Sequence, residues 1–246
     1  MKYFTSSSDT SCPFFKVEGW VNVNVPDLVR FLAEMMHSFG FECSRAGEIG
    51  VHHGRFFLLL ENMCTDGEGV CDAFDVFEDQ YRNLDGSGRG SLSTFKDNVA
   101  KYALSPSRVR IFKVDSMDLR TPEWSKERLG RYDIFSIDGS HTALHTCNDL
   151  MFAEQHLETG GICIVDDINN ISFMGVAEGV SRYLGGGSAR LAPFGVGLNK
   201  LLLAPVGEQA RYFAYLKAKA SQLPFPPVQG APNTTRFHGY DVFRYG

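Results

Sequence analysis

Acidic side chains follow most of the apolar runs in this chain of 246 residues, at the points where strands are expected to end. They occur in residues 48–54 and at Asp75, Asp115, Asp138, Asp166 and Asp167. Carboxylates in such places accept hydrogen bonds from hydroxyl groups and bind hard cations. Because ligands bind beyond the carboxyl ends of the strands in an open α/β sheet, we expect these side chains to surround one site.

The first of these segments has the pattern E-x-G-x-x-x-G, formed by Glu48, Gly50 and Gly54. Glycine lets the backbone approach a ligand closely, although two glycines after a strand can also form just a tight turn. The spacing differs from the dinucleotide pattern G-x-G-x-x-G, and no G-K-[ST] follows, which argues against a phosphate-binding loop. Asp75, at the next strand end, is placed to accept hydrogen bonds from both hydroxyls of a ribose, with Glu78 as the alternative.

Strands and helices are expected to alternate around these residues. Apolar residues at helical spacing predict helices at residues 26–41, 56–60, 95–102, 142–157, 173–184 and 209–223. Apolar runs predict strands at residues 41–50, 70–74, 109–114, 132–137, 162–165, 189–194 and 200–204. The connection at 195–197 between the last two strands is short and implies an antiparallel hairpin. The pattern predicts a doubly wound, Rossmann-like α/β fold with a mostly parallel sheet and a C-terminal antiparallel hairpin.

The composition is typical of a globular protein, with 43% hydrophobic and 22% charged residues. We expect a single domain over residues 1–246, with a core at about 40–205, an N-terminal helix at 26–41 and a C-terminal tail at 207–246. The net charge of -5 and the lack of a basic cluster argue against nucleic acid as a partner.

Neither a membrane segment nor a signal peptide is expected. No apolar stretch approaches the roughly 20 residues of a membrane helix, and residues 1–14 are polar. Six cysteines without a C-x-x-C pattern predict reduced core thiols. We therefore expect a cytoplasmic protein with no membrane partner.

Two strand-end motifs resemble those of a known family. Residues 132–141, YDIFSIDGSH, resemble the pattern YD-h-h-h-h-DG-x-H, in which h is a hydrophobic residue, with Ser136 at one of the h positions. Residues 160–167, GGICIVDD, match the pattern GG-h-h-h-h-DD. Both are similar to class I S-adenosylmethionine-dependent methyltransferases, and within them to the metal-dependent O-methyltransferases of catechols, sugars and macrolides. The resemblance covers residues 40–205, approximately.

The resemblance implies that S-adenosylmethionine binds at the first three strand ends. The methionine part would lie beside Glu48, Gly50 and Gly54, the ribose beside Asp75, and the adenine beside Asp115 and Ser116. The protein would then transfer the methyl group to a hydroxyl of a small-molecule acceptor.

The resemblance also implies a metal site and a base. Asp138, Asp166 and Asp167 match the metal-ligand positions of these enzymes. Three carboxylates at neighbouring strand ends would repel one another unless a divalent cation, most simply Mg²⁺, lay among them. His141 stands where relatives carry a base, and a neutral imidazole can take the proton of a hydroxyl near physiological pH.

Simpler interpretations of the same residues stay open. The carboxylates of Asp138, Asp166 and Asp167 could cap the helices that follow them. His141 and His145 are four residues apart and could form a helical metal pair, but no glutamate accompanies them as in H-E-x-x-H. A related fold with a hydroxylase reaction, an NAD-type oxidoreductase and a non-catalytic scaffold are the alternative functions.

Two segments lie outside these motifs. Residues 83–91 are rich in glycine and predict a flexible lid, a wall of the substrate site, or a plain surface loop. The tail, with one helix near 209–223 and a proline-rich stretch, could cover the site or contact a second subunit in a homo-oligomer. Nothing in the sequence identifies the acceptor as a sugar, a phenol, a polyketide or a peptide.

Overall fold

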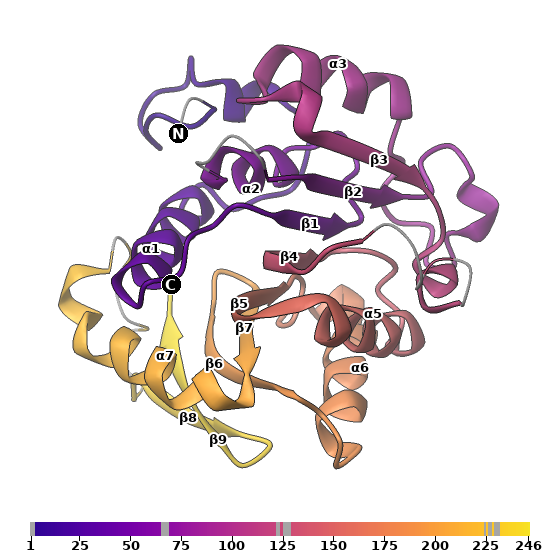
Figure 1. Cartoon of the computed structure of the whole chain (residues 1–246). Coiled ribbons are helices and arrows are strands. Elements are labelled where there is room, and N and C mark those ends of the chain that lie inside the picture. Colours follow the sequence, from indigo (N-terminus) through magenta and orange to yellow (C-terminus); the bar gives the residue numbers. More distant parts are fainter. Residues whose placement is uncertain are drawn as a thin grey trace.

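A computed structural model describes residues 3–64, 69–121, 124, 129–223, 225, 228 and 232–246. These described residues form a nine-stranded sheet in the order β3-β2-β1-β4-β5-β7-β6-β9-β8 (Figure 1). The strands are β1 (Ala46–Ile49), β2 (Cys71–Asp75), β3 (Val109–Lys113), β4 (Tyr132–Ile137), β5 (Leu157–Val165), β6 (Leu191–Gly197), β7 (Lys200–Pro205), β8 (Thr234–Phe237) and β9 (Tyr240–Tyr245).

The pairing of the strands confirms the expected fold class. Strands β1 to β5 run parallel to one another, and β7 pairs antiparallel with both β5 and β6. The strand order reverses between β1 and β4, because the chain moves outward to β2 and β3 before it returns. In doubly wound sheets such a reversal opens a crevice at the carboxyl ends of the strands, where ligands bind.

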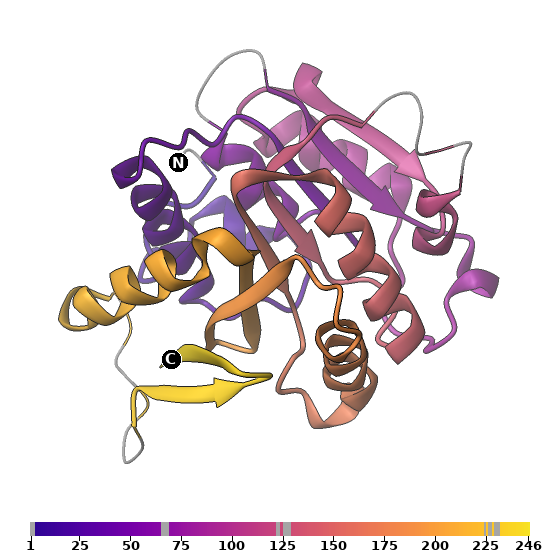
Figure 2. The same ribbon diagram turned by 60° about the horizontal axis from the view of Figure 1, so that its bottom comes forward.

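Helices cover both faces of the sheet (Figures 1 and 2). One apolar core contains residues of α1 (Val25–Ser38), α2 (Phe57–Met63), α3 (Leu92–Tyr102) and α7 (Val206–Ala218). The other core contains residues of α5 (Ala143–His156) and α6 (Met174–Gly185). Short 3₁₀ turns are η1 (Pro13–Lys16), η2 (Gln80–Arg82), η3 (Pro106–Arg108), η4 (Ser116–Arg120), η5 (Ile171–Phe173) and η6 (Ala220–Gln222).

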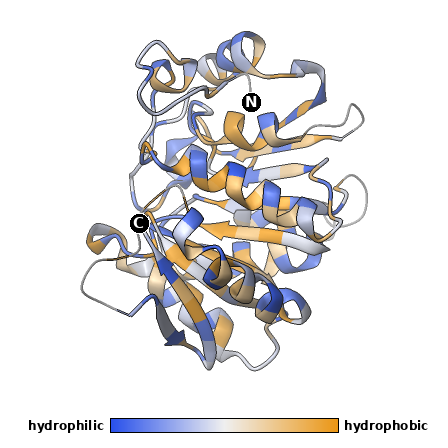
Figure 3. Ribbon diagram, turned by 90° about the vertical axis from the view of Figure 1, so that its left-hand side faces the viewer, coloured by the Kyte–Doolittle hydropathy of each residue, from blue (hydrophilic) through white to orange (hydrophobic). Residues whose placement is uncertain are grey.

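The apolar runs of the central strands supply both cores at once. In β5, Ile162 and Ile164 belong to the core under α1 and α7, whereas Cys163 and Val165 belong to the core under α5 and α6. Successive side chains of a strand point to opposite faces, so a strand buried on both faces must be apolar throughout. The ribbon coloured by hydropathy shows hydrophobic residues along the central strands (Figure 3).

Helix α5 differs from its expected boundaries and face. It ends at His156, and β5 begins directly at Leu157, so Gly160 and Gly161 lie within the strand rather than in a turn. Leu144, whose spacing from Leu150 and Met151 would place it on an apolar face of the helix expected at 142–157, is 58% exposed. The helix packs between the sheet and α6, and its buried face includes the polar Asn148 and Asp149, so apolar spacing alone located that face poorly.

The C-terminal hairpin turns two residues later than expected. Gly195 and Gly197 are part of β6, and the turn consists of Leu198 and Asn199, with φ values of 51° and 64°. A two-residue turn with positive φ at both positions matches the twist of an antiparallel pair. Gly197 is needed for another reason, because a Cβ there would lie 1.8 Å from the carbonyl oxygen of Tyr245 in β9.

The C-terminal tail contributes two strands that the sequence pattern did not predict. β8 and β9 form an antiparallel pair, and β9 runs parallel to β6 and so extends the sheet. The turn between them contains His238 and Gly239, both with positive φ. The expected helix is α7, while most of the proline-rich stretch lies outside the described residues.

All six cysteines are free thiols, as expected, and five of them are buried. Within the described residues, no helix is both long and apolar enough to cross a bilayer.

Candidate active site

A cavity of about 420 Å³ opens at the carboxyl ends of β1, β2, β4 and β5. Nine of the ten residues expected to form the site line it: Glu48, Gly50, Asp75, Asp115, Ser116, Asp138, His141, Asp166 and Asp167. Gly54 does not line the cavity; it lies behind the loop, where a Cβ would be 3.0 Å from the ring of Phe95. The topology therefore gathers residues that are up to 119 positions apart, from Glu48 to Asp167, around one space.

The loop after β1 passes so close to the end of β4 that only glycine fits at its first turn. Gly50 has a φ of 86°, and a Cβ on it would lie 1.8 Å from the carbonyl oxygen of Asp138. Glu48 precedes it and is 1% exposed. Its Oε1 accepts a hydrogen bond from Ser136 Oγ at 3.2 Å, but its Oε2 has no hydrogen-bond partner among the described residues. Burial and the nearby Asp138 raise the pKa of Glu48 well above its usual range.

Asp75 is held rigidly at the end of β2. Its Oδ2 accepts the backbone N–H of His52 at 2.8 Å, and its Oδ1 accepts that of Phe77 at 2.6 Å. Burial raises its pKa, which these two hydrogen bonds partly offset. Glu78, the alternative acceptor, instead binds the backbone N–H of Leu92 at 2.7 Å and does not line the cavity.

Asp115 and Ser116 follow β3, at the start of η4. The Asp115 carboxylate caps the turn by accepting the backbone N–H of Met117 at 3.0 Å. Ser116 is buried, and its carbonyl oxygen accepts a hydrogen bond from Asn148 Nδ2 at 3.0 Å. The two residues thus form a fixed part of the cavity wall next to Asp75, whose carbonyl oxygen accepts the backbone N–H of Val114.

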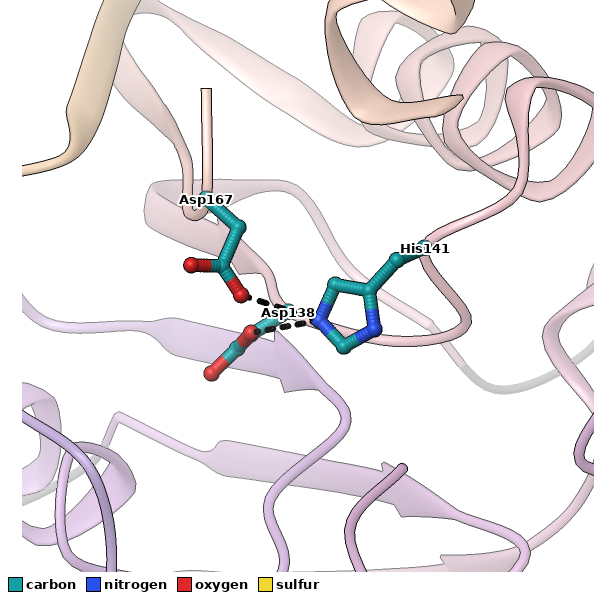
Figure 4. A group of neighbouring side chains, drawn as sticks. All are labelled: Asp138, His141 and Asp167. Atoms are coloured by element: carbon teal, nitrogen blue, oxygen red, sulfur yellow. Dashed lines mark ion pairs between the residues drawn. The ribbon is translucent and has the colours of Figure 1, made fainter. Parts of the chain in front are cut away.

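Asp138, His141 and Asp167 form the acidic centre of the cavity (Figure 4). His141 Nε2 lies 3.1 Å from Asp167 Oδ2 and 3.8 Å from Asp138 Oδ1. One oxygen of each carboxylate and one ring nitrogen of the histidine all lie within 4.8 Å of one another. Such a group can hold a divalent cation or share a proton.

The turn of the C-terminal hairpin orients Asp167. This residue has a φ of 58°, a conformation that is uncommon outside glycine and asparagine. Its Oδ1 accepts hydrogen bonds from Asn170 Nδ2 at 2.9 Å and Asn199 Nδ2 at 2.5 Å. Because the two asparagines bind Oδ1, the other oxygen, Oδ2, faces His141.

Asp166 does not join this group, which differs from the expectation of three clustered carboxylates. Its Oδ2 pairs with the ammonium of Lys200, the first residue of β7, and its Oδ1 accepts the backbone N–H of Asp167 at 2.9 Å. Lys200 is 1% exposed, and its Nζ also lies 4.4 Å from the centre of the Phe56 ring. Burial lowers the pKa of Lys200, but the charges of Asp166 and Asp138 outweigh it and raise the pKa. The positive charge of Lys200 therefore reduces the electrostatic repulsion that was expected among the three carboxylates.

His141 is protonated at neutral pH when nothing else neutralises the two carboxylates. Burial lowers its pKa, but its interactions with the carboxylates of Asp138 and Asp167 dominate and raise the pKa to about 10. An imidazolium cannot accept a proton, so a base at this position needs another positive charge beside Asp138 and Asp167.

Several cavity residues were missed by sequence reasoning. Asp85 and Ser87 bind the other ring nitrogen of His141, and the ring of Phe173 stacks on it with centroids 3.8 Å apart and an interplanar angle of 11°. Trp20 lies at the mouth of the cavity, 77% exposed, with its ring 5.1 Å from that of His52. Asp85 and Ser87 lie in the turn-forming sequence Asp-Gly-Ser-Gly, within the segment expected to be a lid, a wall of the substrate site or a loop, but their contact with His141 had no signal in the sequence.

Comparison with known proteins agrees with this arrangement. Residues 48–168 match a family model described as a methyltransferase domain, which begins at Glu48 and ends just after Asp167. A search of curated proteins found no significant match.

The fold is shared with solved methyltransferases of low sequence identity. The O-methyltransferase NovP is 15% identical, with a TM-score of 0.61 over 75% of this chain and 80% of that chain. Cofactor-bound Rv0187 from MTB is 17% identical, with a TM-score of 0.55 over 78% of this chain and 84% of that chain. An O-methyltransferase from Bacillus cereus in complex with SAH is 16% identical, with a TM-score of 0.50 over 72% and 80%.

Residues 48–168 therefore match a methyltransferase domain, and the chain has the fold of the solved methyltransferases. This match favours a methyltransferase over the oxidoreductase and scaffold alternatives, and it agrees with the resemblance of the two strand-end motifs.

Proposed function

We propose that the protein transfers the methyl group of S-adenosylmethionine to a hydroxyl of a small molecule, with a divalent cation at Asp138 and Asp167 and with His141 as the base. The observation that carries the proposal is the position of His141 Nε2, which faces both carboxylates at the carboxyl ends of β4 and β5. A hydroxyl placed there would lie beside a proton acceptor and two cation ligands.

The cofactor would lie along the carboxyl ends of β1 to β3. Glu48 Oε2 is buried and free to accept hydrogen bonds from the ammonium of the methionine part. Asp75, already fixed by two backbone N–H groups, would accept the ribose hydroxyls with its remaining lone pairs. The adenine would lie between Asp115 and Ser116. With the cofactor so placed, its methyl group would be available to an acceptor bound beside Asp138.

The donor set at the acidic centre fits a divalent cation. Asp138 and Asp167 offer carboxylate oxygens, the ligands that Mg²⁺ and Mn²⁺ prefer, and Asp167 is oriented by two asparagines. When bound, the cation would orient the acceptor and lower the pKa of its hydroxyl. Asp166 would join as a ligand only by giving up Lys200, so we assign it a lesser part than the resemblance implies.

His141 would remove the proton of the acceptor hydroxyl, and the walls of the cavity would position the acceptor. With the carboxylates neutralised, the ring nitrogen Nε2 can accept the hydroxyl proton as the oxygen attacks the methyl carbon and the carbon–sulfur bond breaks. Trp20 and Phe173 provide apolar surfaces for the acceptor at the two sides of the cavity. Holding oxygen, carbon and sulfur in line contributes most of the rate, because the sulfonium is already reactive.

The function is tested with labelled cofactor and a small set of acceptors. The purified protein is incubated with S-[methyl-¹⁴C]adenosylmethionine, Mg²⁺ and either catechol, phenol, methyl glucoside or aniline. Two adjacent oxygens can bind one cation together, so we expect transfer to catechol or to the sugar, and none to aniline. Transfer to aniline alone would contradict the proposal, as would a protein that binds the cofactor and labels none of the four.

Two variants, one at Asp75 and one at Glu78, test the proposed contact between Asp75 and the ribose. Asp75→Ala should weaken binding of S-adenosylmethionine about 10- to 100-fold, because it removes hydrogen bonds to a charged acceptor. Glu78→Ala removes the neighbouring carboxylate, which faces away from the cavity, and should change the affinity less than about twofold. Calorimetric titration measures both. An equal loss of affinity in the two variants would contradict a specific contact between Asp75 and the ribose. It would indicate that the cofactor responds to the overall negative charge of this region.

A further inference from the structure

Asp85 connects the glycine-rich segment of residues 83–88 to His141. A single carboxylate oxygen, Asp85 Oδ2, lies 2.6 Å from the backbone nitrogen of His141 and 2.7 Å from its Nδ1. Asp85 and His141 are 56 positions apart in the chain, and both side chains are largely buried, with exposed fractions of 14% and 12%. This contact is therefore a tertiary connection rather than a local turn.

The hydrogen bonds around Asp85 determine which ring nitrogen of His141 carries a proton. The hydroxyl of Ser87 donates to Asp85 Oδ1 at 2.6 Å, so its oxygen can only accept from His141 Nδ1, 3.0 Å away. A carboxylate also accepts only. Both neighbours of Nδ1 are thus acceptors, and Nδ1 must be the protonated nitrogen. The lone pair of a neutral His141 ring is then on Nε2, which faces Asp138 and Asp167.

The segment around Asp85 is shaped by its own hydrogen bonds. The backbone N–H of Ser87 donates to Asp85 Oδ1 at 2.7 Å, which closes an Asx turn. Asn83 Nδ2 donates to the carbonyl oxygen of Ser87 and lies 3.4 Å from that of Gly88. Asn83, Ser87 and Gly88 line the cavity, so the turn that holds the histidine is also a wall of the site.

We propose that Asp85 is a positioning residue, which fixes the tautomer and the ring orientation of His141 from the wall of the cavity. Phe173 holds one face of the ring, and Asp85 holds its edge. A histidine that acts as a base or a metal ligand is commonly fixed by a carboxylate on its second nitrogen, and loss of such a partner costs about 10- to 100-fold in activity. The inference rests on the proposed function, in which Nε2 accepts the proton.

Kinetics and proton NMR of Asp85→Asn test the proposal, with Leu84→Ala as the control. Leu84 lies in the same segment but is 69% exposed and does not line the cavity. Asparagine keeps the shape of the side chain but removes the charge that strengthens both hydrogen bonds. The acceptor is the one that is methylated in the labelling experiment described above. We expect its kcat to fall about 10- to 100-fold in Asp85→Asn, with little change in the Kd of S-adenosylmethionine. Leu84→Ala should stay within about twofold of the wild type.

The NMR measurement separates this inference from the proposed function, because it needs no acceptor. In the wild-type protein with bound S-adenosylmethionine, the Nδ1–H proton and the backbone N–H proton of His141 should resonate far downfield. Both should move upfield in Asp85→Asn and stay in place in Leu84→Ala. A wild-type spectrum without a protonated Nδ1, or Asp85→Asn with unchanged kcat and unchanged shifts, would overturn the role of Asp85. A protein with these shifts but no transfer to any hydroxyl would overturn only the proposed function.

Discussion

Replacing His141 with alanine is expected to lower kcat roughly 10²- to 10⁴-fold, the usual contribution of a general base. The affinity for S-adenosylmethionine should change little, because the cofactor would lie over β1 to β3, while His141 follows β4. The lost rate should be partly recovered at high pH, where the acceptor hydroxyl ionises without help. Initial rates at saturating cofactor from pH 7 to 10 measure the effect.

His156→Ala is the control for this variant. His156 ends α5, the helix that begins two residues after His141, and its ring contacts Phe152, both at the carbonyl oxygen and at the aromatic ring, and does not line the cavity. It should keep near wild-type turnover. A wild-type kcat in His141→Ala would contradict the role of His141 as the base. It would not bear on the proposed cation site.

Removal of the cation should lower the rate of methyl transfer by a similar factor, for two reasons. A metal bound to the acceptor supplies several kcal/mol of stabilisation, or roughly 10²- to 10³-fold in rate. In addition, His141 without a cation has its pKa raised to about 10 by Asp138 and Asp167, so the ring is protonated at neutral pH and cannot act as a base. In excess chelator, the residual rate should therefore rise as pH increases towards 10, as the ring loses its proton.

The double variant Asp138→Asn, Asp167→Asn should abolish stimulation by Mg²⁺ or Mn²⁺ while it still binds S-adenosylmethionine. Asp79→Asn is the matched control, since Asp79 is a carboxylate that pairs with Lys113 outside the cavity. Asp166→Asn should lose less than the double variant, because Asp166 faces Lys200. Full wild-type activity in excess chelator would contradict a role for the metal.

The sequence predicted the fold class and the location of the site because both depend on local patterns. Continuous apolar runs mark strands that are buried on both faces, and the acidic residues at their ends meet at one edge of the sheet. Most of the expected residues accordingly line the same cavity, including Glu48, Asp75 and Asp138. Their individual roles stay predictions.

The remaining features depend on contacts between distant segments, which local patterns do not specify. Lys200 pairs with Asp166 only because β7 lies beside β5, and Asn199 reaches Asp167 only because the hairpin turn falls at 198–199. Asp85 reaches His141 across 56 positions. The last two strands were missed for a similar reason, because β9 pairs with β6, a strand far from it in the chain.

Paramagnetic broadening of the cofactor methyl group tests the central claim, that cation and cofactor meet at Asp138 and Asp167. The measurement records the ¹³C-methyl signal of S-[methyl-¹³C]adenosylmethionine bound to the protein while Mn²⁺ is added, with Mg²⁺ as the diamagnetic reference. We expect strong broadening in the wild-type protein and in Asp79→Asn, and none in the Asp138→Asn, Asp167→Asn double variant. A methyl signal that stays sharp in wild-type protein with Mn²⁺ present, or one that broadens equally in the double variant, would contradict the account.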